Sequence, residues 1–113
     1  MLLTTDYATQ EPTRSEVDLL KGPTLLEFGS PWCGYCNRVE PLVVGALAKH
    51  PGVRHIRIAD ASGRRLGRSF HVKLWPTLIF FKDGEEVGRL VRPSETSKIQ
   101  NGLAAIDMSN AAR

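Results

Sequence analysis

Cysteine, aromatic side chains and long apolar runs are all scarce in this sequence. Two cysteines in 113 residues are too few for a small scaffold held together by several disulfides. No apolar run reaches the roughly 18 residues that a membrane-spanning helix needs, so none is predicted. Residues 1–6 have neither a basic start nor an apolar stretch, which argues against a secretory signal. We therefore expect a cytoplasmic protein, or a periplasmic one only if a signal peptide was removed before the first residue.

Positive charge is in mild excess and is unevenly distributed. The net charge is +3. Residues 54–73 carry one acid, Asp60, against the basic side chains Arg54, Arg57, Arg64, Arg65, Arg68 and Lys73. A nucleic-acid surface would have aromatic side chains among these cations, and this stretch holds only Phe70. We predict a solvated face that attracts acidic partners and no nucleic-acid site.

The apolar pattern predicts one domain in which helices and strands alternate. Helices are predicted over residues 14–21, 33–49, 64–70 and 94–103, and strands over 24–28, 53–59, 77–81 and 86–91. The last two strands form a hairpin through Asp83-Gly84, a strong turn signal. The early strands, which are separated by helices, are expected to pair in parallel and the late hairpin to be antiparallel. The result is an α/β fold with a mixed sheet of four to five strands and helices on both faces.

The chemistry is concentrated in residues 28–36, with the sequence Phe-Gly-Ser-Pro-Trp-Cys-Gly-Tyr-Cys, between a buried strand and a long helix. Cys33 is placed at the start of the helix, where free backbone N–H groups and the helix dipole stabilise a thiolate. Cys36 follows one turn later and can form a labile disulfide with Cys33. Glu27 is an acid in an otherwise apolar strand. These features predict a redox-active cysteine pair.

A zinc site, a structural disulfide and a non-catalytic binding module are the alternative roles for the cysteine pair. A zinc site needs four ligands, and His50, His55 and His71 supply no second close pair. A purely structural disulfide across so short a loop would stabilise the fold very little. A binding module would instead hold a partner in the groove near Trp32 and Pro76, without any exchange of disulfides.

The sequence resembles the thioredoxin family over roughly residues 13–103. The resemblance is carried by the Cys-Gly-Tyr-Cys motif of residues 33–36, by Pro41, by Trp75-Pro76-Thr77 and by the hairpin of residues 80–85. It implies a thioredoxin-like domain over 13–103, with an N-terminal arm or edge strand over 1–12 and a tail over 104–113. It also implies a protein disulfide oxidoreductase that exchanges disulfides with partner proteins through its own cysteines and needs no metal or other cofactor.

The resemblance also implies a role for individual residues. Cys33 is the nucleophile and Cys36 resolves the mixed disulfide. Glu27 corresponds to a buried acid of the family; because burial raises the pKa of carboxyl groups in general, such an acid can exchange a proton with Cys36. Pro76 corresponds to a cis proline facing the cysteines, and the backbone of Trp75 would pair with an extended substrate. The predicted substrate-binding residues are Trp32, Gly34, Tyr35, Trp75 and Arg92.

The sequence departs from the family at several of these places. Tyr35 stands where thioredoxins have proline, which adds a backbone N–H near Cys33. Gly29 replaces a tryptophan, and Arg92 lies at the groove rim, where it would favour acidic targets. Arg57 corresponds to a family lysine near the buried acid. We expect a monomer that acts on protein disulfides, accepts electrons from an upstream reductase, and binds neither nucleic acid nor membrane.

Overall fold

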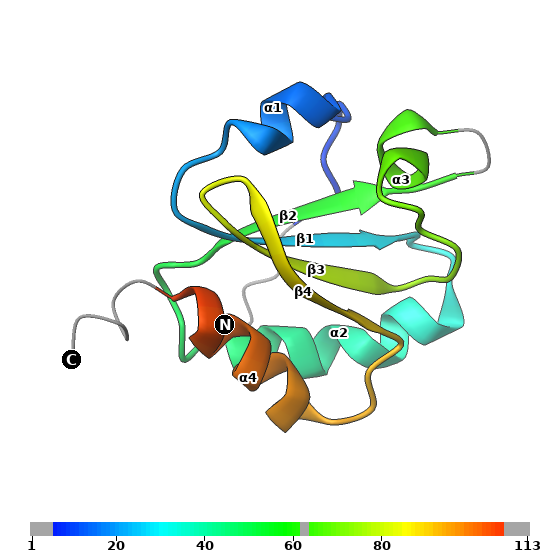
Figure 1. Ribbon diagram of the computed structural model, residues 1–113. Coiled ribbons are helices and arrows are strands. Elements are labelled where there is room, and N and C mark those ends of the chain that lie inside the picture. The colour runs from blue at the N-terminus through cyan, green and yellow to red at the C-terminus, as the bar shows by residue number, and fades with distance from the viewer. Residues whose placement is uncertain (1–5, 62–63, 108–113) are drawn as a thin grey trace.

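The computed structural model describes residues 6–61 and 64–107. Its elements follow the predicted order (Figure 1): α1 (Arg14–Asp18), β1 (Pro23–Gly29), α2 (Gly34–Leu47), β2 (Arg54–Ala59), α3 (Arg65–Ser69), β3 (Thr77–Lys82), β4 (Glu85–Val91) and α4 (Thr96–Ile106). Residues 1–5 of the predicted arm and 108–113 of the predicted tail lie outside the described residues. Among the described helices, none is long and apolar enough to cross a membrane.

The sheet has the strand order β2-β1-β3-β4, which places β1 in its interior. Alternate side chains of β1 and β3 enter two separate apolar clusters, one on each face. Leu25 and Phe80 pack with α2 and α4, whereas Phe28 and Ile79 pack with α1 and α3. Figure 1 shows the same arrangement, with α2 and α4 on one side of the sheet and α1 and α3 on the other. The predicted fold class is confirmed.

The early strands β1 and β2 pair in parallel, as predicted, whereas β3 of the hairpin pairs differently with β1. Strand β3 lies antiparallel to β1, with Thr77 opposite Phe28. The connection from Ala59 to Thr77 includes the five-residue helix α3. Because Thr77 lies opposite Phe28, the chain enters β3 at the end of the sheet where β1 and β2 finish, which brings Trp75 and Pro76 to the start of α2.

The hairpin between β3 and β4 forms through the predicted Asp-Gly turn. Lys82 pairs with Glu85, and Asp83 and Gly84 have φ of 52° and 83°. Two consecutive residues of positive φ match the twist of an antiparallel pair. A Cβ on Gly84 would overlap the backbone oxygen of Asp18, so this position requires glycine both for its conformation and for space.

Helices α1 and α4 differ most from the predictions in where they end. Helix α1 stops at Asp18 rather than at residue 21, and α4 continues past residue 103 to Ile106. Ile106 is buried in the apolar cluster with α2, and the next residue, Asp107, pairs with His50 at 2.5 Å. These tertiary contacts extend α4 beyond the point where its sequence pattern fades.

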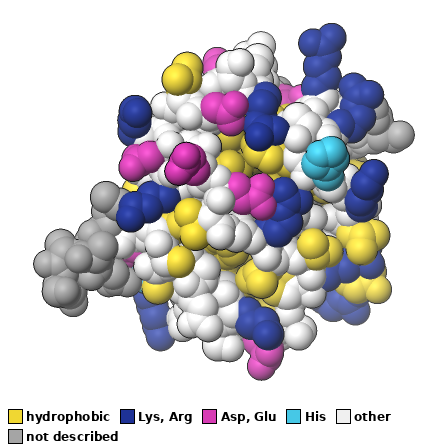
Figure 2. Space-filling model, viewed as in Figure 1, with side chains coloured by type: hydrophobic (Ala, Val, Ile, Leu, Met, Phe, Trp, Pro, Cys, Tyr) yellow, Lys and Arg dark blue, Asp and Glu magenta, His cyan; other side chains and the backbone are white. Residues whose placement is uncertain are grey.

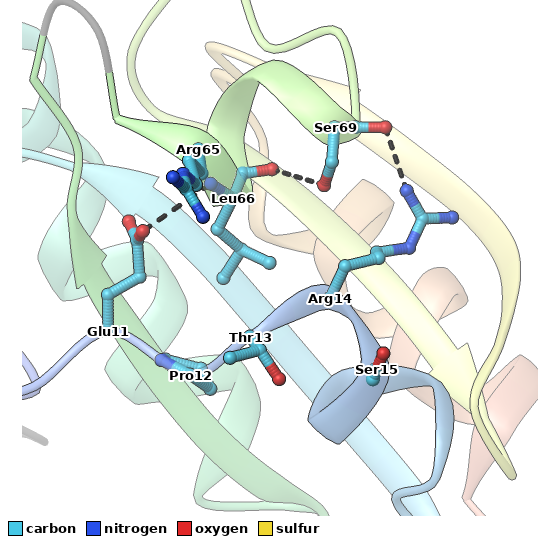
Figure 3. A pocket seen from close by; sticks show the side chains of 8 residues that line it. All are labelled: Glu11, Pro12, Thr13, Arg14, Ser15, Arg65, Leu66 and Ser69. Atoms are coloured by element: carbon cyan, nitrogen blue, oxygen red, sulfur yellow. Dashed lines mark hydrogen bonds between the residues drawn. The ribbon is translucent and has the colours of Figure 1, made fainter.

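The N-terminal segment is attached to the sheet and to α3. Tyr7 forms an isolated parallel bridge with Arg57 of β2, and the Ala8 N–H donates to the Arg57 carbonyl at 2.8 Å. Farther along, a Glu11 carboxylate oxygen accepts from the Leu66 N–H at 3.4 Å (Figure 3). The predicted Thr13–Glu16 capping box then starts α1. Arg14 donates to the Ser69 carbonyl at 2.7 Å. Glu11, Leu66, Arg14 and Ser69 line one pocket between the N-terminal segment and α3 (Figure 3).

Candidate active site

A tight turn after β1 sets the position where α2 begins. The Trp32 N–H donates to the Ser30 hydroxyl at 3.1 Å, and the Cys33 N–H donates to the Ser30 carbonyl at 3.2 Å. Pro31, between them, has no N–H that would need a partner. The turn therefore places Cys33 between the end of β1 and Gly34, the first residue of α2.

Cys33 is the N-cap residue of α2 and is partly exposed. Its sulfur accepts a hydrogen bond from the Cys36 N–H at 3.2 Å. An N-cap side chain ordinarily accepts from an amide in the first helical turn, and a donor of this kind stabilises an anionic sulfur. The expected extra donor was the Tyr35 N–H, but the donor found is that of Cys36. That amide is present whichever residue occupies position 35.

Cys36 differs sharply from Cys33 because its side chain is completely buried. Burial raises the pKa of the Cys36 thiol to about 12, and a hydrogen bond with the Cys33 side chain and the nearby charge of Glu27 act in the same direction. A hydrogen bond with the backbone of Ser30 opposes them. The two cysteines therefore occupy unlike environments one helical turn apart.

Trp75 and Pro76 face this pair from the other side. The Trp75–Pro76 peptide bond is cis, as predicted, and Pro76 is buried. The Trp75 carbonyl oxygen lies 4.0 Å from the Cys33 sulfur and accepts a hydrogen bond from Arg92 Nε at 2.8 Å. The indole N–H of Trp75 donates to Asp60 at 3.0 Å, which fixes the ring at the side of the site.

The predicted groove residues surround Cys33 and are not core residues. Trp32 is 91% exposed and Tyr35 is 46% exposed. The guanidinium groups of Arg92 and Arg38 lie 3.8 Å and 4.6 Å from the centre of the Tyr35 ring. Gly34, the first residue of α2, is exposed beside them. Exposed aromatic side chains next to a thiol form a surface that can receive an apolar segment.

Glu27 lies in a buried cluster of charged side chains behind Cys36. Only 1% of the residue is exposed, and its Oε1 pairs with His55 Nε2 at 2.8 Å and lies 3.6 Å from Arg57 Nε. Oε2 is buried without a hydrogen-bond partner. Arg57 also donates to Glu40 at 3.1 Å. The structure thus places Arg57 beside the acid, as the resemblance implies.

Sequence reasoning missed His55 and Tyr7. His55 is an unremarkable member of β2 in the sequence, and its contact with Glu27 follows from the register that sets β1 against β2. The Tyr7 ring lies 4.1 Å from the Arg57 guanidinium. The only signal for Tyr7 in the sequence is the missing side chain at Gly29, which leaves space behind Cys36.

Basic side chains border the site next to Trp75. A shallow hollow there is lined by Asp60, Ala61, Val72 and Trp75 together with Arg64, Arg68 and Lys73. Figure 2 shows lysine and arginine side chains gathered at the edge of the molecule where α3 lies. Within residues 6–61 and 64–107, no three metal-ligating side chains come together.

Comparison with known proteins gives a consistent result. A sequence model of the thioredoxin family matches residues 5–105. Thioredoxin 2 from Pseudomonas aeruginosa PAO1, solved in its reduced form, superimposes with a TM-score of 0.84 at 45% identity, covering 95% of this chain and 99% of that one. A Chlamydia trachomatis thioredoxin is 36% identical over 73 residues, which are 65% of this chain and 72% of that protein. The putative thioredoxin H10 of Arabidopsis thaliana is 28% identical over 81 residues, 72% of this chain, and the match spans about half, 52%, of its length.

The unequal burial of the two thiols predicts unequal alkylation. Because its raised pKa keeps Cys36 protonated until the pH approaches 12, Cys33 should be the alkylated residue near neutral pH. A Cys33→Ser variant should react with iodoacetamide about a hundredfold more slowly than a Cys36→Ser variant. Mass spectrometry of the modified peptides measures both rates. Equal rates in the two folded variants would show that burial does not separate the thiols.

Proposed function

This chain belongs to the thioredoxin family of thiol–disulfide oxidoreductases, and on that premise we propose that Cys33 and Cys36 reduce disulfides in partner proteins. The observation that carries the proposal is the Cys36 N–H directed at the partly exposed Cys33 sulfur, with the Cys36 thiol buried one turn behind it. One sulfur is accessible to a substrate, and the other is accessible only to the first.

In the proposed reaction, the Cys33 thiolate attacks one sulfur of the substrate disulfide. A mixed disulfide forms, and the other substrate sulfur leaves as a thiolate that takes a proton from water. Cys36 then loses its proton and attacks the Cys33 sulfur, which releases the second substrate thiolate and leaves a Cys33–Cys36 disulfide. Two electrons have passed from the protein to the substrate. An upstream reductase must return them, a requirement that a reducing compartment such as the cytoplasm meets.

Glu27 is proposed to receive the proton that Cys36 loses. Its Oε1 is held by His55, whereas Oε2 has no hydrogen-bond partner and remains available for proton exchange. The charge of Glu27 acts on the Cys36 thiol, which supports their proximity. His55 is a positioning residue in this scheme because it orients the carboxylate without contacting the sulfurs.

Substrates with acidic segments are proposed to bind preferentially. Arg92 and Arg38 flank Tyr35 on one side of the site, and Arg64, Arg68 and Lys73 border Trp75 on the other. Cations around an apolar surface favour negatively charged partners and slow the association of positive ones. Because the Trp75 carbonyl already accepts from Arg92, an extended substrate would pair with it only by displacing that side chain.

The dithiol reaction is tested by reduction of insulin with dithiothreitol as the electron source. The wild-type protein should accelerate the reaction well above the background, and Cys33→Ser should abolish the acceleration. Cys36→Ser should instead accumulate covalent complexes that dithiothreitol dissociates, because the resolving thiol is gone. A non-catalytic binding module would give no acceleration and no trapped complex, which would contradict the proposal.

The role of Glu27 is tested by Glu27→Gln, which keeps the shape of the side chain and removes its acid. We expect the rate of insulin reduction to fall by about tenfold or more, since proton transfer by a positioned group commonly contributes at least that much. Glu40→Gln is the matched control because Glu40 pairs with the same arginine at 38% side-chain exposure. Equal rates in the two variants, both shown to be folded by circular dichroism, would exclude a special role for the buried acid.

The charge preference is tested with two disulfide peptides of equal length, one acidic and one basic. Arg92→Glu should lower kcat/KM for the acidic peptide by about tenfold at low salt, and added salt should shrink the difference. Arg92→Lys keeps the charge and should retain the preference. Lys49→Glu, which changes charge beyond the opposite end of α2, serves as the control. An unchanged ratio between the peptides in Arg92→Glu would refute selection by this arginine.

A further inference from the structure

Tyr7 brings a phenol from the N-terminal segment into the space behind the cysteine pair. Its backbone is fixed by the bridge to Arg57 and by the bond from Ala8 N–H to the Arg57 carbonyl. Its hydroxyl is buried and makes no well-aligned hydrogen bond, although the Arg57 side chain is close enough to act on it as a donor. A buried hydroxyl is costly when its own proton has no acceptor, so its role depends on the group to which it can donate.

Gly29 shows where the hydroxyl lies relative to Cys36. A Cβ placed on Gly29 would be 2.8 Å from the Cys36 sulfur and 3.2 Å from the Tyr7 oxygen. Both atoms therefore border the same small space, and their separation cannot exceed 6.0 Å, the sum of the two distances. Any larger residue at position 29 would occupy this space and separate them.

The groups around Tyr7 determine what its hydroxyl can do. The Arg57 guanidinium, 4.1 Å from the ring centre, offers only N–H donors, so it can bind the phenol oxygen but cannot accept its proton. The charged or titratable acceptors that act on Tyr7 are Cys36 and Glu27. Burial raises the pKa of Tyr7 to about 12, which keeps the phenol protonated and able to donate at neutral pH.

We propose that the Tyr7 hydroxyl donates a hydrogen bond to the Cys36 sulfur as that sulfur becomes anionic during resolution of the mixed disulfide. The step keeps the balance already given: the Cys36 proton leaves, the Cys36–Cys33 bond forms, and the bond from Cys33 to the substrate sulfur breaks. Tyr7 keeps its own proton and only stabilises the charge. This inference rests on the proposed function, because it concerns the second of its two steps.

The need for such a donor follows from the burial of Cys36. A thiolate formed there has lost contact with water, and this burial raises the pKa of the Cys36 thiol to about 12. The phenol can supply a hydrogen bond that water cannot. The Arg57 guanidinium next to the ring withdraws electron density and strengthens the phenol as a donor. Contacts from Glu11 to Leu66 and from Arg14 to Ser69 hold the following part of the segment (Figure 3).

The two steps can be separated with one equivalent of dithiobis(nitrobenzoate), which releases a coloured thiolate at each of them. Attack by Cys33 releases the first, and attack by Cys36 on the resulting mixed disulfide releases the second. Stopped-flow absorbance follows both phases in one experiment. In Tyr7→Phe the first phase should keep its rate and the second should slow by about tenfold, the effect of one hydrogen bond to a charged group.

Urea unfolding of the same variant separates this role from packing. Tyr7→Phe keeps the ring against Arg57 and removes a buried hydroxyl that makes no well-aligned hydrogen bond, so its stability should change little. Tyr7→Leu, which also loses the ring, should slow the second phase at least as much and lower the stability. A second phase within twofold of the wild type in folded Tyr7→Phe would overturn the inference about Tyr7. A wild-type protein without any second phase would instead overturn the proposed function.

Discussion

The site depends on one constraint, which is that Cys33 caps the start of α2 at the end of the sheet where β1 finishes. The Ser30 turn fixes this starting point, and the first turn of the helix then has an amide that only the Cys33 sulfur caps. Pro76 faces the cysteines because β3 enters the sheet at this same end, with Thr77 opposite Phe28. If the helix began one residue later, the Cys33 sulfur would lose its capping position.

A difference in burial gives the two cysteine side chains different reactivity. Cys33 remains accessible and receives a hydrogen bond, whereas Cys36 lies among apolar side chains with Glu27 and Tyr7 close behind it. The accessible Cys33 sulfur can react with many substrates, whereas the buried Cys36 sulfur can react only with a group attached to Cys33. This asymmetry arises from a helical period that directs residue 33 outward and residue 36 inward. A separation of three residues in the sequence is therefore enough to give the two thiols unlike environments.

Local sequence patterns were enough to predict most of the architecture and the exposed part of the site around Cys33. The Asp83-Gly84 turn, the Thr13–Glu16 cap and the two faces of β1 and β3 are properties of near neighbours in sequence. The antiparallel pairing of β3 with β1 was not predicted, because it depends on the path of the whole connection between β2 and β3. His55 and Tyr7 were missed because their relation to Glu27 and Cys36 exists only after β2 has paired with β1 and the N-terminal segment has joined β2.

The attachment of the N-terminal segment to β2 also concerns the behaviour of the protein in concentrated solution. A sheet edge with free amides and carbonyls is a template on which a second molecule can polymerise. On the β4 side, the pairing of the edge strand with β3 shifts register between Gly88 and Glu86, and β4 carries the Glu86–Arg89 ion pair. On the β2 side, the bond from Ala8 to Arg57 occupies part of the edge. The segment that carries Tyr7 therefore also covers part of the β2 edge and opposes edge-to-edge aggregation. Substitutions in this segment would affect both the surroundings of Cys36 and the tendency of the protein to aggregate.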